Sequence, residues 1–130
     1  MRSTAPATIE SVARELVELC RAGRNLDAIN ALYAPEIVSL EPAGNDQFPA
    51  RTTGIDAIRK KNQWWFDAFE VRRHEVEGPY INGDQFAVKY IFEATEKKTG
   101  TQQDLAEIGV YTVKDGKIAQ ERFFTLSPEG

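Results

Sequence analysis

The stretch from Gln85 to Glu96 reads QFAVKYIFEATE, and its alternation of apolar and polar side chains decides the fold. Every second side chain, beginning with Phe86, is apolar or aromatic, whereas Lys89, Glu93 and Thr95 fall between them. Because successive side chains of a strand point to opposite faces, this pattern predicts a β-strand with one buried face. The buried set lines the interior: Phe86, Val88, Tyr90, Phe92 and Ala94.

Turn signals on both sides of this stretch place it in an antiparallel meander. Asn82-Gly83-Asp84 precedes it as a tight turn, and Asp115-Gly116 is a strong hairpin signal further along the chain. Pro79 marks the far end of the preceding strand or a bulge in it. The neighbouring strands are expected at residues 71–78, 101–113 and 117–126.

The N-terminal half has helical periodicity instead. Apolar residues recur at three-to-four spacing from Thr8 to Arg21, with Thr8 as N-cap and Gly23 at the C-terminal end. A second helix follows from Asn25, with Leu26 on its inner face, and Pro35 ends it. The remaining expectations are a strand at 37–40, a surface loop at 43–53 and a third helix at 55–69.

These elements predict one α+β domain spanning residues 1–130, with residues 1–7 as a flexible N-terminus. Three N-terminal helices would pack on one face of a strongly curved, mixed or antiparallel sheet. A sheet that curls around the first helix makes a cone with a cavity open at one end.

The composition excludes several classes of function. Apolar residues make up 42% of the chain and charged residues 28%, which is typical of a globular protein. The net charge of -4 argues against nucleic acid as a partner. Apolar runs are far shorter than a membrane span and no signal segment is recognisable, so no membrane partner and a cytoplasmic location are expected. With one cysteine, Cys20, and one histidine, His74, we expect no disulfide, metal or cofactor.

Three segments resemble the SnoaL-like, ketosteroid-isomerase-like superfamily of the nuclear transport factor 2 type. They are 21–29 with 32–34, the strand end Val38-Ser39-Leu40-Glu41-Pro42, and 109–118. The similarity extends from about Thr8 to Thr125 and includes Trp64-Trp65. It implies a cone-shaped, cystatin-like α+β fold. One fold hosts many activities, so the site must decide the function.

The resemblance also implies roles for single residues. In ketosteroid isomerases of this fold, the carboxylate before the proline at the first strand's end shuttles the substrate proton, and that position is Glu41. Their oxyanion hole uses a tyrosine and a protonated aspartate, whose positions match Leu16 and Gly109. Polyketide cyclases of this fold rely instead on an acid/base carboxylate in the cavity.

Strand parity supplies further catalytic candidates. Glu107 shares parity with Gly109 and Tyr111 and should point inward, where it acts as an acid or forms a structural salt bridge. His74 shares parity with Val76, so it either faces the cavity as a tuned acid/base or is a hydrogen-bonded core residue. Glu41 is either the base or an exposed loop cap.

Several residues are expected to form the walls of the pocket. Of the adjacent Trp64 and Trp65 only one can face straight into it, and we favour Trp65. Cys20 is expected to be a small core residue, and Lys60 and Lys61 to belong to a solvated face. The candidate ligand-binding residues are Trp65, Tyr90, Phe92, Tyr111, Glu121 and Asn62, although parity does not settle the direction of Glu121.

The sequence thus favours a protein that binds a small, largely apolar metabolite, polyketide-like or steroid-like. It would transfer a proton without a cofactor, as an isomerase or cyclase does. The alternative is a non-catalytic ligand-binding or dimerisation module. A homodimer is expected in either case, through the outer sheet face that carries Ile91, Ile108 and Val110, with Lys89 and Glu93 at its rim.

Overall fold

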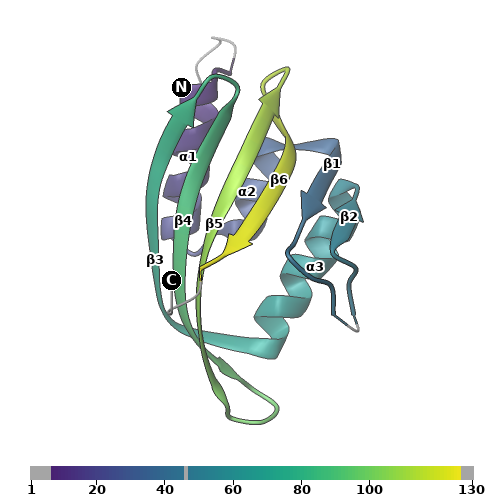
Figure 1. Ribbon diagram of the computed structural model, residues 1–130, viewed down its shortest axis with the longest axis vertical. Coiled ribbons are helices and arrows are strands. Elements are labelled where there is room, and N and C mark those ends of the chain that lie inside the picture. Colours follow the sequence, from purple (N-terminus) through teal and green to yellow (C-terminus); the bar gives the residue numbers. More distant parts are fainter. Residues whose placement is uncertain (1–6, 46, 127–130) are drawn as a thin grey trace.

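The computed structural model describes residues 7–45 and 47–126 (Figure 1). The helices are α1 (Ile9–Arg21), α2 (Asn25–Leu32) and α3 (Ile55–Ala68). The strands are β1 (Tyr33–Leu40), β2 (Arg51–Thr53), β3 (Phe69–Asn82), β4 (Gln85–Glu96), β5 (Gln102–Lys114) and β6 (Lys117–Thr125). Apart from Ala7, the expected flexible N-terminus at 1–7 lies outside the described residues.

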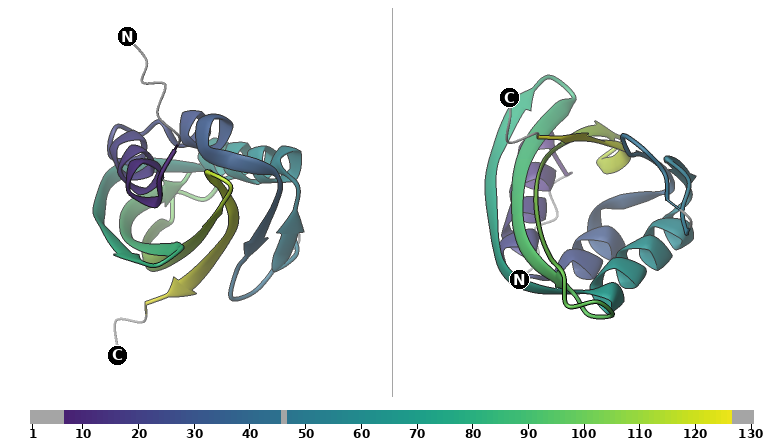
Figure 2. Two further views of the ribbon diagram at one scale, coloured as in Figure 1. Left: turned by 90° about the horizontal axis from the view of Figure 1, so that it is seen from above. Right: turned by 60° about the horizontal axis from the view of Figure 1, so that its bottom comes forward.

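One mixed sheet carries all six strands, in the order β2-β1-β6-β5-β4-β3. The pair β1 and β6 is parallel, and every other neighbouring pair is antiparallel. The sheet is strongly curved but not closed, and the three helices lie along its open concave side (Figure 2). The predicted α+β architecture of three helices on a curved sheet is confirmed.

Helix α1 forms as its end signals predict. The Thr8 side chain accepts a hydrogen bond from the Ser11 amide, the Ser11 side chain accepts one from the Thr8 amide, and Gly23 has a φ of 73° just beyond the helix. Its apolar face is buried against β3 and β4. The side chains of that face are Val12, Ala13, Leu16, Val17 and Cys20.

The alternation in β4 is also confirmed. Phe86, Val88 and Tyr90 are at most 4% exposed and belong to the core, together with Leu16 of α1 and Tyr111 of β5. Burying each such side chain contributes roughly 1.5–3 kcal/mol. The opposite, outer face carries the half-buried Ile91, Ile108 and Val110; the homodimer that would use this face stays a prediction.

Some boundaries were wrong. The predicted loop at 43–53 ends in the short edge strand β2, which pairs with β1, because three residues are too few to show periodicity. Strand β1 begins at Tyr33 rather than Ile37, and Leu26 is 39% exposed rather than inward. Of the two alternatives at Pro79, the bulge is the one observed, since β3 continues to Asn82 and the β3–β4 register shifts between Glu77 and Tyr80. No helix in the described ranges is long and apolar enough to span a membrane.

Candidate functional site

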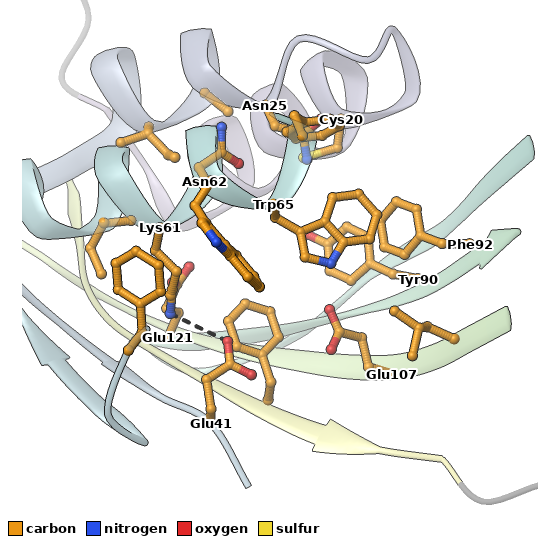
Figure 3. Close-up of a pocket in the computed structure, with 18 of the residues that line it drawn as sticks. Cys20, Asn25, Glu41, Lys61, Asn62, Trp65, Tyr90, Phe92, Glu107 and Glu121 are labelled. Atoms are coloured by element: carbon orange, nitrogen blue, oxygen red, sulfur yellow. Dashed lines mark hydrogen bonds and ion pairs between the residues drawn. The ribbon is translucent and has the colours of Figure 1, made fainter. Parts of the chain in front are cut away.

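A cavity of about 450 Å³ lies between the helices and the concave face of the sheet. Helix α3 contributes Lys61 and Asn62, the strands contribute side chains from their inward faces, and the loop after β1 forms part of the wall with Pro42 and Phe48. The volume is in the range of ligand pockets in other proteins. Figure 3 shows polar groups converging on it from several elements.

Aromatic rings make up one wall. Trp65 lies 5.6 Å from Phe92 between ring centroids and stacks on Phe69 at 5.2 Å. Trp64 also lines the cavity, with its ring 5.7 Å from that of Phe48. Both tryptophans therefore contribute to the wall, and the choice of Trp65 as the one that faces straight into the cavity stays a prediction. Such a surface suits a flat, apolar ligand.

Three carboxylates line the same cavity: Glu41 after β1, Glu107 on β5 and Glu121 on β6. The Glu107 carboxyl points into the pocket across from Glu41 (Figure 3). Burial raises the pKa of Glu107 from 4.5 to about 7, with smaller contributions from the charges of Glu41 and Glu121. Two acids in unlike environments are the arrangement that divides the roles of acid and base.

Glu121 is the deepest of the three, at 3% exposure. The Tyr33 hydroxyl donates a hydrogen bond to its Oε1, and the Ser39 hydroxyl donates one to its Oε2 over 2.7 Å. Burial raises the pKa of Glu121, and these two donors oppose the rise by stabilising the carboxylate. The inward direction that parity left open is thus settled by two partners on β1.

Lys61 is the unexpected member of the site. Its Nζ lies 3.3 Å from Glu41 Oε1 and donates to Ser39 Oγ over 3.0 Å, and its side chain is only 18% exposed. The prediction of a solvated face was wrong for Lys61, whereas Lys60 is exposed. The spacing held the signal, because Lys61 follows Ile58 by three residues and precedes Trp65 by four, which places it on their face.

A second polar cluster lies deeper in the cavity. The hydroxyls of Tyr90 and Tyr111 are 2.6 Å apart, and burial raises the pKa of both. Cys20 is buried nearby, and desolvation raises the pKa of its thiol to about 11, which disfavours the nucleophilic thiolate. Its interpretation as a core residue therefore agrees with its surroundings.

The family model described as the SnoaL-like domain matches residues 13–121, which is most of the chain. The chain belongs to the SnoaL-like domain family. A search of curated proteins found no match.

Solved structures agree with this assignment. A Mesorhizobium loti protein provisionally described as a SnoaL-like polyketide cyclase is 43% identical, with a TM-score of 0.84, over 90% of this chain and 98% of that one. A Xanthomonas campestris protein of cystatin-like fold is 18% identical with a TM-score of 0.74, over 94% of this chain and 93% of that one. A Bacillus subtilis protein provisionally described as an isomerase is 16% identical with a TM-score of 0.72, over 91% of this chain and 86% of that one. The last two show the shared fold alone.

Most of the predicted site residues of this SnoaL-like chain meet at the cavity. They are Glu41, Asn62, Trp65, Tyr90, Phe92, Glu107, Tyr111 and Glu121. His74 is the exception: its Nε2–H donates to the carbonyl oxygen of Arg21 at the end of α1 over 3.0 Å, and it is not among the pocket-lining residues. Its prediction as a catalytic group is corrected accordingly, since that bond turns the ring toward the helix end.

The two positions that correspond to the oxyanion hole of ketosteroid isomerases cannot donate a hydrogen bond from a side chain. Leu16 is an apolar lining residue. A Cβ at Gly109 would lie 2.9 Å from the Tyr111 hydroxyl and 3.0 Å from Phe123, so no acid could stand there without displacing them. In this SnoaL-like protein any oxyanion donor must come from other residues of the cavity.

The site offers no set of metal ligands: no group of three or more His, Cys, Asp or Glu within residues 7–45 and 47–126 could hold a metal ion. The expectation that no cofactor takes part stays a prediction.

Sequence reasoning missed Tyr33, Ser39 and Lys61 as members of the site. Tyr33 and Ser39 belong to the site through their hydrogen bonds to Glu121, and a partner so far along the chain leaves no sign in local spacing.

Proposed function

We propose that this SnoaL-like protein binds a small, largely apolar metabolite and transfers a proton within it, as an isomerase or cyclase does, without a cofactor. Glu41 is the base and Glu107 is the acid or hydrogen-bond donor. A polyketide-like or steroid-like molecule fits the aromatic wall formed with Trp65 and Phe92. The similar protein from Mesorhizobium loti is provisionally described as a SnoaL-like polyketide cyclase, which supports an activity of the cyclase type.

One observation carries the proposal: two carboxyl groups of unlike surroundings face one cavity. Glu41 lies beside an ammonium group, which compensates the charge of its ionised form. Burial raises the pKa of Glu107 to about 7, so a large share of it keeps its proton at neutral pH. A general base and a general acid are thus present together at one pH.

The reaction step balances without any further reagent. A C–H bond next to a carbonyl group of the ligand breaks, the proton moves to the Glu41 carboxylate, and the electron pair moves to the carbonyl oxygen. Returning the proton to a different carbon isomerises the ligand. Attack of the enolate carbon on a second carbonyl instead closes a ring, and the proton held by Glu41 then passes to the alkoxide oxygen that this attack forms. The apolar walls exclude water and so strengthen the electrostatic interactions in the pocket.

The test is hydrogen exchange into 2-tetralone, a flat ketone with acidic α-protons, in D₂O followed by proton NMR. The wild-type protein should exchange these protons faster than buffer does, and Glu41→Gln should slow the exchange by about 10²–10⁴-fold. Glu36→Gln is the matched control, because Glu36 is an exposed residue of β1, the strand that precedes Glu41. Exchange no faster than in buffer, or equal rates for the wild type and Glu41→Gln, would contradict the proposal.

A further inference from the structure

The ammonium group of Lys61 is held where it can donate a hydrogen bond to an oxygen atom of a reacting ligand. Its ammonium group has three N–H donors. Two of them are engaged, by Ser39 Oγ at 3.0 Å and Glu41 Oε1 at 3.3 Å, and these are the acceptors found for Lys61 in the described part of the chain. The third donor can therefore serve a ligand that enters the cavity.

We propose that Lys61 is a catalytic residue that binds the carbonyl oxygen of the substrate and stabilises the negative charge formed when Glu41 removes the α-proton. This inference rests on the proposed function and goes beyond it. It names the donor that takes the place of the missing oxyanion hole. It also names the substrate class, a flat ketone or dicarbonyl compound with an acidic C–H group beside the carbonyl.

Geometry supports this role because Lys61 and Glu41 are neighbours. The carbonyl oxygen and the α-carbon of a ketone are only two bonds apart. A carbonyl oxygen that accepts a hydrogen bond from Nζ therefore brings the α-carbon close to the Glu41 carboxylate, whose Oε1 lies 3.3 Å from the same nitrogen. Figure 3 shows Glu41 and Lys61 together on one side of the pocket and Glu107 on the other, where its carboxyl group can serve as the acid or hydrogen-bond donor.

The movement of charge supports it as well. Before the proton transfer, the negative charge next to Lys61 resides on Glu41; afterwards it resides on the substrate oxygen. The ammonium group lies beside both positions and need not move between them. Preorganised charges of this kind cost no reorganisation during the reaction, and the loss of a single oxyanion donor typically slows a reaction by about 10²–10³-fold.

The hydrogen bonds around Lys61 hold it in place for this purpose. Ser39 accepts from Lys61 and donates to Glu121, which also accepts from Tyr33. The charge of the ammonium group also works against the rise in the pKa of both Glu107 and Glu121. This network of hydrogen bonds keeps Nζ at the cavity wall, although the side chain of a lysine is flexible.

The test measures charge stabilisation rather than turnover, with 4-nitrophenol as the probe, because only its phenolate absorbs strongly in the visible range. Glu41→Gln resembles the protonated base and removes the carboxylate that is in direct contact with Lys61. The probe bound to Glu41→Gln should ionise at a lower pH than the probe bound to Glu41→Gln/Lys61→Met. A difference of one pH unit or more is expected, which corresponds to about tenfold or greater stabilisation of the phenolate.

Two control variants separate this role from a structural one. Glu41→Gln/Lys60→Met removes the exposed neighbouring lysine and should titrate like Glu41→Gln. Glu41→Gln/Lys61→Arg keeps the charge and should retain most of the shift, with circular dichroism checking that each variant is folded. Equal titration with and without Lys61, or a Glu41→Gln protein that does not bind the phenolate, would overturn the proposal.

The outcomes also separate the two proposals. If the bound probe ionises at the same pH with and without Lys61, while 2-tetralone still exchanges its protons in a Glu41-dependent way, only the role of Lys61 is refuted. A clear shift together with no exchange in the wild type would instead refute the proposed proton transfer and leave Lys61 as the oxyanion-binding group of the pocket.

Discussion

Replacing Glu107 by glutamine should make the protein more stable at neutral pH and change how its stability depends on pH. The pKa of Glu107 is raised from 4.5 to about 7 in the folded protein, mainly by burial. The folded state therefore binds this proton more tightly than the unfolded state does. Between pH 4.5 and pH 7 the contribution of Glu107 to stability falls as pH rises, and above pH 7 the full loss is present.

The magnitude follows from the two values. At about 1.4 kcal/mol for each pH unit between them, the loss is about 3 kcal/mol. This figure is an upper limit, because water reaching the pocket screens part of the cost. Glutamine has no charge to bury, so the advantage of Glu107→Gln over the wild type should grow by up to about 3 kcal/mol from pH 4.5 to 7.5.

Urea unfolding at a series of pH values measures this difference directly. Glu36→Gln, which removes an exposed carboxylate from β1, corrects for the loss of one acidic group. A difference in the free energy of unfolding between Glu107→Gln and the wild type that is constant from pH 4.5 to 7.5 would refute the reasoning.

Three further predictions concern other parts of the structure. Tyr33→Phe removes a donor to the buried carboxylate of Glu121 and should lower the free energy of unfolding by about 1–3 kcal/mol, whereas Tyr80→Phe, at an exposed ring, should change it little in the same urea titration. Gly109→Ala places a Cβ 2.9 Å from a tyrosine hydroxyl and should cost about 1–3 kcal/mol; an unchanged melting temperature would argue against this close packing. Light scattering should give the wild type twice the chain mass of 14.6 kDa and Ile108→Glu the mass of one chain, and a monomeric wild type would contradict the proposed dimer.

Local pattern was sufficient where burial and periodicity agree. The alternation from Phe86 to Ala94 predicted the inner face of β4, and parity alone turned Glu107 inward, where it lies opposite Tyr90 in the β4–β5 register. Thr8 and Gly23 bounded α1 for local reasons, because capping and a positive φ depend on few residues. These features require no knowledge of distant contacts.

The polar network around Glu121 could not be read in this way. Phe123 and Phe124 are apolar residues on opposite faces of β6, so alternation gives no direction there, and Phe124 is 48% exposed. The direction comes from the parallel pairing of β1 with β6, which sets Ser39 opposite Glu121 across a long separation in the chain. A partner so distant leaves no trace in local spacing.

Lys61 illustrates a different difficulty. Its charge suggested exposure, since lysine is almost never fully buried without a partner. The partner, Glu41, follows a different element of the chain, and the pair forms only after β1 packs beside α3. Residue type overrode helical spacing in the prediction, although the spacing was correct.

The most direct test of proton transfer by this carboxylate pair is the pH dependence of the exchange of 2-tetralone protons in D₂O. If Glu107 must hold its proton, the wild-type rate should decline as pH rises through about 7, where Glu107 loses it. Glu107→Gln should exchange more slowly and show no such decline. A rate that rises steadily across this range, equally in the wild type and in Glu107→Gln, would contradict the assignment of base and acid to this pocket.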